Sequence, residues 1–196
     1  VFDDNGNGSG GDDVMSAGDG FDRFAGDLGD DDISGGSGND TLAGGAGDDI
    51  LSGGSDGDFL AGGAGFDRLT GGSGTDLLDG GAGGDEMGGG PGNDEYRVNG
   101  AGDSIIEAAG NGVDRVTASV SYSLAEGASI EQFDVLSAAG TAAIDLTGNE
   151  ISNSMRGNFG ANRLRGEGGN DSFLGLDGND HLYGGFGNDA LNGGAG

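Results

Sequence analysis

The sequence predicts an all-β fold, a solenoid of short parallel strands, and three observations support this prediction. The segment from Gly35 to Asp79 divides into rows of nine residues that each begin with Gly-Gly. The sixth residue of every row is Asp, and the eighth is apolar. Gly makes up 51 of the 196 residues and Trp is absent, so large side chains are too few for an ordinary globular core. A strict short period indicates structural repeats that stack on one another.

The same register covers the first 97 residues, although residues 1–7 fit it poorly. The apolar eighth position continues from Met15 to Tyr96. A disordered acidic spacer would have no reason to keep an apolar column in phase with an acidic one. The sixth-position residues are Asp13, Asp22, Asp31, Asp40, Asp49, Asp58, Asp67, Asp76, Asp85 and Asp94.

One row, Gly44 to Ser52, shows how each repeat is expected to fold. Its Gly-Gly-x-Gly segment allows positive φ angles and a tight turn whose carbonyl oxygens point to one side. Asp49 adds a carboxylate to this turn. In the short strand that follows, Leu51 points inward and its neighbours point outward. The next row repeats this on the opposite side, so two rows form one coil, and equivalent strands stack about 4.8 Å apart.

This stacking places the sixth-position aspartates in two columns, one containing Asp13 and the other containing Asp22. Carboxylates so close together repel one another and require a counter-ion. A mixture of carboxylate and carbonyl oxygens selects Ca²⁺, whereas Mg²⁺ prefers strict octahedral sites that retain water. The absence of Cys and the single His, His181, argue against Zn²⁺ or copper.

Rows such as GGSGNDTLA resemble the nonapeptide G-G-x-G-x-D-x-U-x of the RTX (repeats-in-toxin) family. The resemblance covers most of the chain, with a gap in the middle. It implies a parallel β-roll in which each Ca²⁺ ion lies between two turns of one edge, bound by sixth-position carboxylates and turn carbonyls. About eight ions are implied for the first block and roughly eight to twelve for the whole chain. The implied carbonyl ligands are Gly36, Gly38, Gly45, Gly47, Gly54, Gly63, Gly65, Gly72, Gly74, Gly81 and Gly83.

The period of nine stops at Val98, and residues 98–138 are expected to continue the solenoid as an irregular β segment. Strands are predicted at 104–106, 115–124 and 130–136, with a helical subdomain within 125–136 as the less favoured alternative. The segment resembles those found between RTX blocks. Its acids Asp103, Glu107 and Asp114 are candidate ligands of a further ion, or else ordinary solvated acids. Glu131 is expected at the surface.

The nine-residue period returns in residues 139–196, which form the second block. Its sixth-position residues are Ile144, Asn153 and Asn162, and then Asp171, Asp180 and Asp189. The asparagine rows are predicted to stack without calcium through amide hydrogen bonds, and calcium binding is predicted to resume from about residue 166. Arg156, Arg163 and Arg165 are interpreted as charge relief beside acids rather than as a contact for an anionic glycan or a partner.

These observations favour a calcium-dependent folding module of a secreted bacterial protein, located outside the cell or on its surface. The resemblance implies export by type I secretion machinery, and the coil ends could stack on one another. A calcium-stiffened stalk, adhesin or surface-layer segment is the alternative, and a glycan- or ice-binding solenoid is a more distant one. A formal net charge of −28 argues against nucleic acid, and no apolar run is long enough to span a membrane.

No enzyme active site is predicted, because the period of the carboxylates explains them as ligands and leaves no distinct acid–base pair. His181 alone cannot form a catalytic triad. The chain begins without Met and ends within a repeat, which suggests a piece of a longer protein whose other domains could be enzymatic.

Overall fold

The computed structural model describes residues 4–196, and it confirms the all-β prediction. The described residues form strands, turns and bends, without a helix. No helix in this part of the chain could therefore cross a membrane. The chain divides into two compact units, one extending to Glu107 and the other from Ala108 to Gly196.

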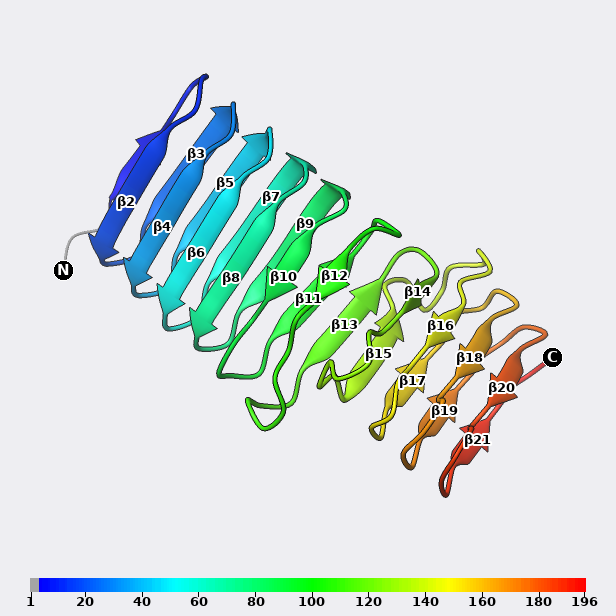
Figure 1. Ribbon diagram of the computed structural model, residues 1–196. Coiled ribbons are helices and arrows are strands. Elements are labelled where there is room, and N and C mark those ends of the chain that lie inside the picture. The colour runs from blue at the N-terminus through cyan, green and yellow to red at the C-terminus, as the bar shows by residue number, and fades with distance from the viewer. Residues whose placement is uncertain (1–3) are drawn as a thin grey trace. The chain divides into compact units, whose positions relative to one another are not determined.

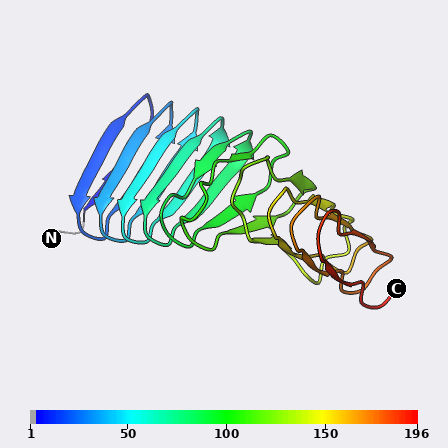
Figure 2. The ribbon, with the colours of Figure 1, turned by 60° about the horizontal axis from the view of Figure 1, so that its bottom comes forward.

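The first unit is a solenoid with two parallel sheets, and successive strands alternate between them. One sheet contains β1 (Asn5–Asn7), β3 (Arg23–Leu28), β5 (Thr41–Ala46), β7 (Phe59–Gly65), β9 (Leu77–Gly83) and β11 (Glu95–Val98). The other contains β2 (Val14–Asp19), β4 (Asp32–Ser37), β6 (Ile50–Ser55), β8 (Arg68–Ser73), β10 (Glu86–Gly88) and β12 (Ser104–Ile105). Figure 1 shows these coils stacked in sequence order, and Figure 2 shows their turns gathered along two edges.

The register between stacked strands is eighteen residues, as the two-row coil predicts. Leu42 pairs with Leu60 in one sheet, and Leu51 pairs with Leu69 in the other. The eighth-position side chains from Ile33 to Tyr96 are at most 1% exposed. The core is therefore a thin double layer, one side chain from each row.

Residues 4–7 continue the coil although residues 1–7 fit the sequence period poorly, and residues 1–3 lie outside the described part of the chain. Strand β1 pairs with β3, and Gly6 lies beside Phe24 at the eighth position. A Cβ on Gly6 would lie 2.5 Å from the ring of Phe24. The aromatic ring fills the space of the missing apolar side chain, so the sequence signal disappears while the coil continues.

The second unit also contains two parallel sheets. One is formed by β13 (Arg115–Ala118), β15 (Gln132–Val135), β17 (Ser154–Arg156), β19 (Ser172–Leu174) and β21 (Ala190–Asn192). The other is formed by β14 (Tyr122–Ser123), β16 (Leu146–Thr147), β18 (Arg163–Arg165) and β20 (His181–Tyr183). The eighteen-residue register holds from Met155 to Phe173 and from Leu146 to Leu164.

The irregular segment forms strands, but not with the predicted bounds. The strand expected at 115–124 is two strands, β13 and β14, separated by a bend that moves the chain from one sheet to the other. The helical alternative for 125–136 is wrong, since this stretch contains turns and β15. Tyr122 of β14 packs edge-on against Phe133 of β15, with ring centroids 6.1 Å apart.

Candidate metal centres

The sixth-position aspartates connect successive coils along each edge. The backbone N–H of Asp40 donates to Oδ1 of Asp58 over 2.8 Å, and the N–H of Asp58 donates in the same way to Asp76. The same bond joins Asp76 to Asp94 and Asp31 to Asp49. From Asp22 to Asp94 these side chains are 1–3% exposed. Each edge of the first unit therefore carries a buried ladder of carboxylates.

The second carboxylate oxygen, Oδ2, is buried and accepts no hydrogen bond from the described protein groups. It faces the first glycine of its own row: a Cβ on Gly35 would overlap Oδ2 of Asp40 and lie 2.8 Å from the carbonyl oxygen of Gly53. A buried charged oxygen without a donor is strongly unfavourable unless a cation neutralises it. The residues whose Oδ2 is buried without a donor are Asp13, Asp22, Asp31, Asp40, Asp49, Asp58, Asp67, Asp76, Asp85, Asp171 and Asp180. Of these, Asp22 has Ala17 rather than a glycine at the first position of its row.

Glycines at the second and fourth positions allow the turns to stack closely. Gly63 and Gly65 have φ angles of 118° and 144°. A Cβ on Gly63 would lie 2.9 Å from the carbonyl carbon of Gly45, and one on Gly65 would lie 2.6 Å from that of Gly47. Backbone carbonyls of one turn thus approach the Cα atoms of the next. Carboxylate and carbonyl oxygens are together at each turn, and this hard donor set fits Ca²⁺.

The turn shape is retained where the glycine pattern is broken. Asp27 and Asp56 occupy positions that are usually glycine, and their φ angles are 73° and 74°. Leu176 in the second unit has a φ angle of 80°. Positive φ is unfavourable for residues with a Cβ, so the surrounding coils impose the turn.

Burial raises the pKa of seven of the ladder aspartates. It raises the pKa of Asp58 to about 7 and that of Asp67 to about 6, and backbone hydrogen bonds offset only part of this effect. Repulsion from neighbouring aspartates raises both values further. The pKa values of Asp40, Asp49, Asp76, Asp85 and Asp171 are also raised, mainly by burial. Protons and Ca²⁺ therefore compete for the same oxygens.

This competition predicts a pH dependence for the calcium-free chain. Because the folded pKa values lie above the ordinary value of 3.8, the folded state binds more protons than the unfolded state between pH 4 and pH 7. Folding without calcium should therefore become more favourable as the pH falls from about 7 toward 4 and less favourable as it rises again. Far-UV circular dichroism in chelator across this range measures the effect, and β content that does not change with pH would contradict it.

The predicted ligands of the irregular segment have separate partners. Asp103 continues the Asp13 column: its Oδ1 accepts from the N–H of Asp85 over 3.3 Å, and its Oδ2 from the N–H groups of Asn99 and Gly100. Glu107 instead accepts from the hydroxyl of Tyr96. Within residues 4–196, no group of three or more acidic, His or Cys side chains is placed to hold a metal by side chains alone. Calcium binding by Asp103, Glu107 and Asp114 stays a prediction.

Two members of the ladders were missed by sequence reasoning. The N–H of Asp4 donates to Oδ1 of Asp22 over 2.6 Å, so Asp4 occupies a sixth position. Glu131, expected at the surface, accepts from the N–H of Asp114 over 2.9 Å and takes the role of a ladder carboxylate. Its position immediately before strand β15 is the position that ladder aspartates occupy before their strands. The nine-residue period did not reveal this, because this coil is not eighteen residues long.

The predicted amide hydrogen bonds of the asparagine rows are confirmed. The Nδ2 group of Asn153 donates to the carbonyl oxygen of Ile130 over 2.6 Å, and that of Asn162 donates to Ile144 over 2.9 Å. Beyond them the carboxylate ladder resumes, since the N–H of Asn153 donates to Asp171 and that of Asp171 donates to Asp189.

Arg163 and Arg165 lie beside acids, as expected for charge relief, whereas Arg156 forms no ion pair within residues 4–196. Arg163 lies 3.6 Å from Asp145, and Arg165 lies 3.6 Å from Glu167 and over the ring of Tyr183. These side chains are about half exposed, so each pair contributes at most about 1 kcal/mol to stability.

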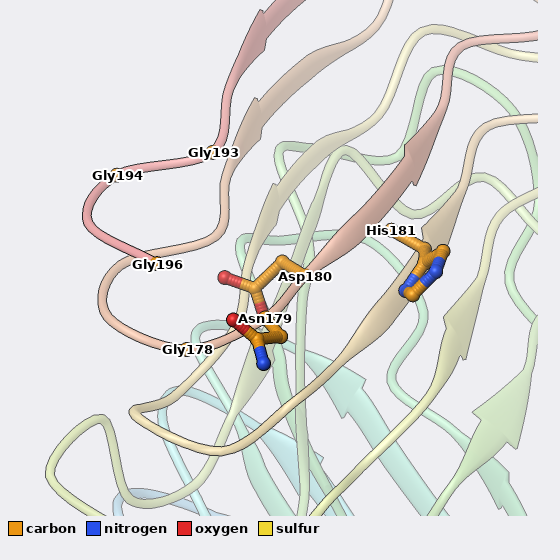
Figure 3. Close-up of a pocket in the computed structure, with 7 residues that line it drawn as sticks. All are labelled: Gly178, Asn179, Asp180, His181, Gly193, Gly194 and Gly196. Atoms are coloured by element: carbon orange, nitrogen blue, oxygen red, sulfur yellow. The ribbon is translucent and has the colours of Figure 1, made fainter.

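Asp180 lies in a pocket of about 270 Å³ lined by glycines of two successive turns. Figure 3 shows its carboxylate near the loop of Gly193, Gly194 and Gly196, whereas the side chain of His181 lies apart from it. His181 is exposed, as expected for a surface residue. Oδ1 of Asp180 accepts from the N–H of Asn162 over 2.9 Å, which continues the ladder of this edge.

Comparison with known proteins agrees with this geometry. The profile of the RTX calcium-binding nonapeptide repeat matches residues 7–42, 25–60, 34–69, 52–87, 61–96, 147–180 and 166–196. These matches cover both repeat blocks and leave out the irregular segment. The comparison with curated proteins found no match. Since the repeat profile covers more than half of the residues, the chain belongs to the family of RTX calcium-binding nonapeptide-repeat proteins.

Proposed function

We propose that Ca²⁺ ions bind between the sixth-position aspartates of successive coils and that their binding folds the chain. The observation that carries this proposal is the buried Oδ2 oxygen that recurs, without a donor, in turn after turn of both edges. One divalent ion between two carboxylates neutralises both and replaces the missing hydrogen bonds. The family's name gives the metal, and the oxygen donors of the turns fit it.

The ladder defines the proposed sites as pairs of aspartates eighteen residues apart. About eight ions follow for the first unit, and Asp171 with Asp189 adds a site in the second. The turn carbonyls of the intervening glycines complete each coordination shell. The pairs in the first unit are Asp13 with Asp31, Asp22 with Asp40, Asp31 with Asp49, Asp40 with Asp58, Asp49 with Asp67, Asp58 with Asp76, Asp67 with Asp85, and Asp76 with Asp94.

Calcium binding would supply the folding free energy that the core lacks. From Ile33 to Tyr96 each row buries one large side chain, while ordering so many glycines costs much backbone entropy. When metal sites form only in the folded state, the binding free energy stabilises that state directly. With affinities of about 10⁻⁴ to 10⁻³ M, as in extracellular modules, the chain would stay unfolded in a low-calcium cytosol and fold outside.

We further propose that the chain acts outside a bacterial cell, after export in an unfolded state by a type I system. RTX repeats are typical of secreted bacterial proteins, and calcium-dependent folding suits passage of an unfolded chain through a channel. These repeats are structural calcium-binding elements, and no catalytic role is proposed for them.

Replacing one ladder aspartate tests the proposed sites. In the proposal Asp49 belongs to two sites, with Asp31 and with Asp67, so Asp49→Ala should lower the bound calcium by about two ions and weaken affinity. Equilibrium dialysis and isothermal titration calorimetry measure both quantities.

The matched control is Asp32→Ala, which removes an exposed carboxylate at the first residue of β4. It should leave the number of bound ions unchanged. Equal losses in the two variants would mean that calcium binds by general charge attraction rather than in the ladders.

A further inference from the structure

The asparagine turns of the second unit differ from the aspartate turns in one respect: their inward oxygens have donors. Oδ1 of Asn162 accepts from the N–H of Asn158 over 2.9 Å, and Oδ1 of Asn153 accepts from the N–H of Asn149 over 3.2 Å. These oxygens occupy the place of the aspartate Oδ2, since a Cβ on Gly157 would lie 2.5 Å from Oδ1 of Asn162.

A second asparagine completes each turn. Asn158 donates to the carbonyl oxygen of Ala142 over 3.0 Å, and its own Oδ1 accepts from the N–H of Gly160 and from the amide of Asn162. Asn149 donates to the carbonyl oxygens of Ala125 and Ala128 over 3.0 and 2.7 Å. We call these four residues, Asn149, Asn153, Asn158 and Asn162, the asparagine clamp.

The clamp is buried, neutral and satisfied by the protein itself. Its four side chains are 1–5% exposed, and none of their polar atoms is a buried group without a partner. A fully satisfied buried polar network stabilises the fold, and a neutral one requires no counter-ion.

The coils beside the clamp also have a denser apolar core. Nine apolar side chains are buried between residues 116 and 146, whereas eight are buried between residues 33 and 96, a stretch about twice as long. Phe133 and Ile130, both fully buried, belong to this denser region. Hydrophobic burial is roughly proportional to area, so this region gains more stability per residue than the repeats do.

We propose that residues 115–165 form a calcium-independent core, in which the asparagine clamp replaces the metal at two consecutive turns. The repeats that follow it in the second unit, residues 166–196, then fold onto it when calcium binds. The second statement rests on the function proposed above, whereas the first does not. The asparagines at the sixth position are thus specificity-determining residues, because they decide which turns bind calcium.

Hydrogen–deuterium exchange of the full chain in excess EGTA tests the calcium-independent core. Amides of residues 115–165 should be protected roughly tenfold or more above those of residues 22–94. Exchange of residues 115–165 at the rate of the repeats would overturn the core. Protection of residues 22–94 in EGTA would instead overturn calcium-dependent folding of the repeats. The exchange of peptides from residues 115–165 would still show, independently, whether the calcium-independent core exists.

The double variant Asn153→Asp and Asn162→Asp tests the role of the clamp. It converts both turns to the calcium-binding pattern and removes two amide donors. In EGTA, protection of residues 144–165 should fall to the level of the repeats; in millimolar calcium it should return, with at least one additional ion bound.

The control Asn170→Asp and Asn188→Asp adds the same charge at exposed turn positions of the same unit. Asn170 uses its side-chain oxygen to accept from the N–H of Asn188, and Asp retains that oxygen. Protection in EGTA should be unchanged in this control. If the clamp variant also keeps its protection in EGTA, the amides do not hold the core and the proposal fails.

Discussion

Removal of calcium is expected to unfold the repeats of the first unit. A site that binds only the folded state contributes about 2.7 kcal/mol at a calcium concentration 100-fold above its Kd. The summed contribution of eight such sites would exceed the roughly 5–15 kcal/mol by which an ordinary domain is stable. Metal binding would therefore be the largest favourable contribution to the folding free energy. In chelator the β signal of the first unit should be lost from the far-UV circular dichroism spectrum. Small-angle scattering should show an increased radius of gyration, and millimolar Ca²⁺ should reverse both changes.

Magnesium at the same concentration is the control for this experiment. Its smaller radius and strict octahedral geometry suit the stacked turns poorly, so Mg²⁺ should restore little of the β signal. A chain that stays as compact and as heat-resistant in chelator as in calcium would show that the core suffices, and the proposed role of the metal would be wrong.

The second large effect is expected from Gly65→Ala. Gly65 has a φ angle of 144°, and a Cβ there would lie 2.6 Å from the carbonyl carbon of Gly47, well inside van der Waals contact. The atom in the way belongs to the backbone, so relief requires the two turns to separate, which distorts the proposed site of Asp49 and Asp67. The variant should lose about 3 kcal/mol or more of stability in calcium. Thermal unfolding and the calcium midpoint of folding measure this loss.

Gly10→Ala is the matched control in another turn. Its Cβ would lie 3.8 Å from the Cβ of Leu28, an ordinary contact, and Gly10 is not among the positive-φ residues. Its melting temperature and calcium midpoint should stay close to those of the unchanged chain. A comparable loss in both variants would indicate that any added methyl group disturbs the roll, irrespective of turn geometry.

The sequence was sufficient for the features that depend on local repetition. The apolar eighth position and the sixth-position Asp recur every nine residues, so the register that pairs Leu51 with Leu69 followed directly. Features that depend on coil length were hidden. Glu131 joins the ladder because a coil of another length brings it opposite Asp114. The clamp at Asn149 depends on carbonyls more than twenty residues away, and no local pattern places them.

The hydrogen bonds between sixth-position residues also couple neighbouring calcium sites to one another. Asp58 donates its N–H to Asp76 and accepts from the N–H of Asp40, so one correctly placed turn orients the carboxylate of its neighbour. A row of units coupled only to nearest neighbours behaves like a one-dimensional lattice, in which order propagates once it has begun. Half-filled ladders would then be scarce, and the transition with calcium would be steeper than that of independent sites. With such cooperativity, a modest difference in calcium concentration across a membrane would be enough to keep the chain unfolded on one side and folded on the other.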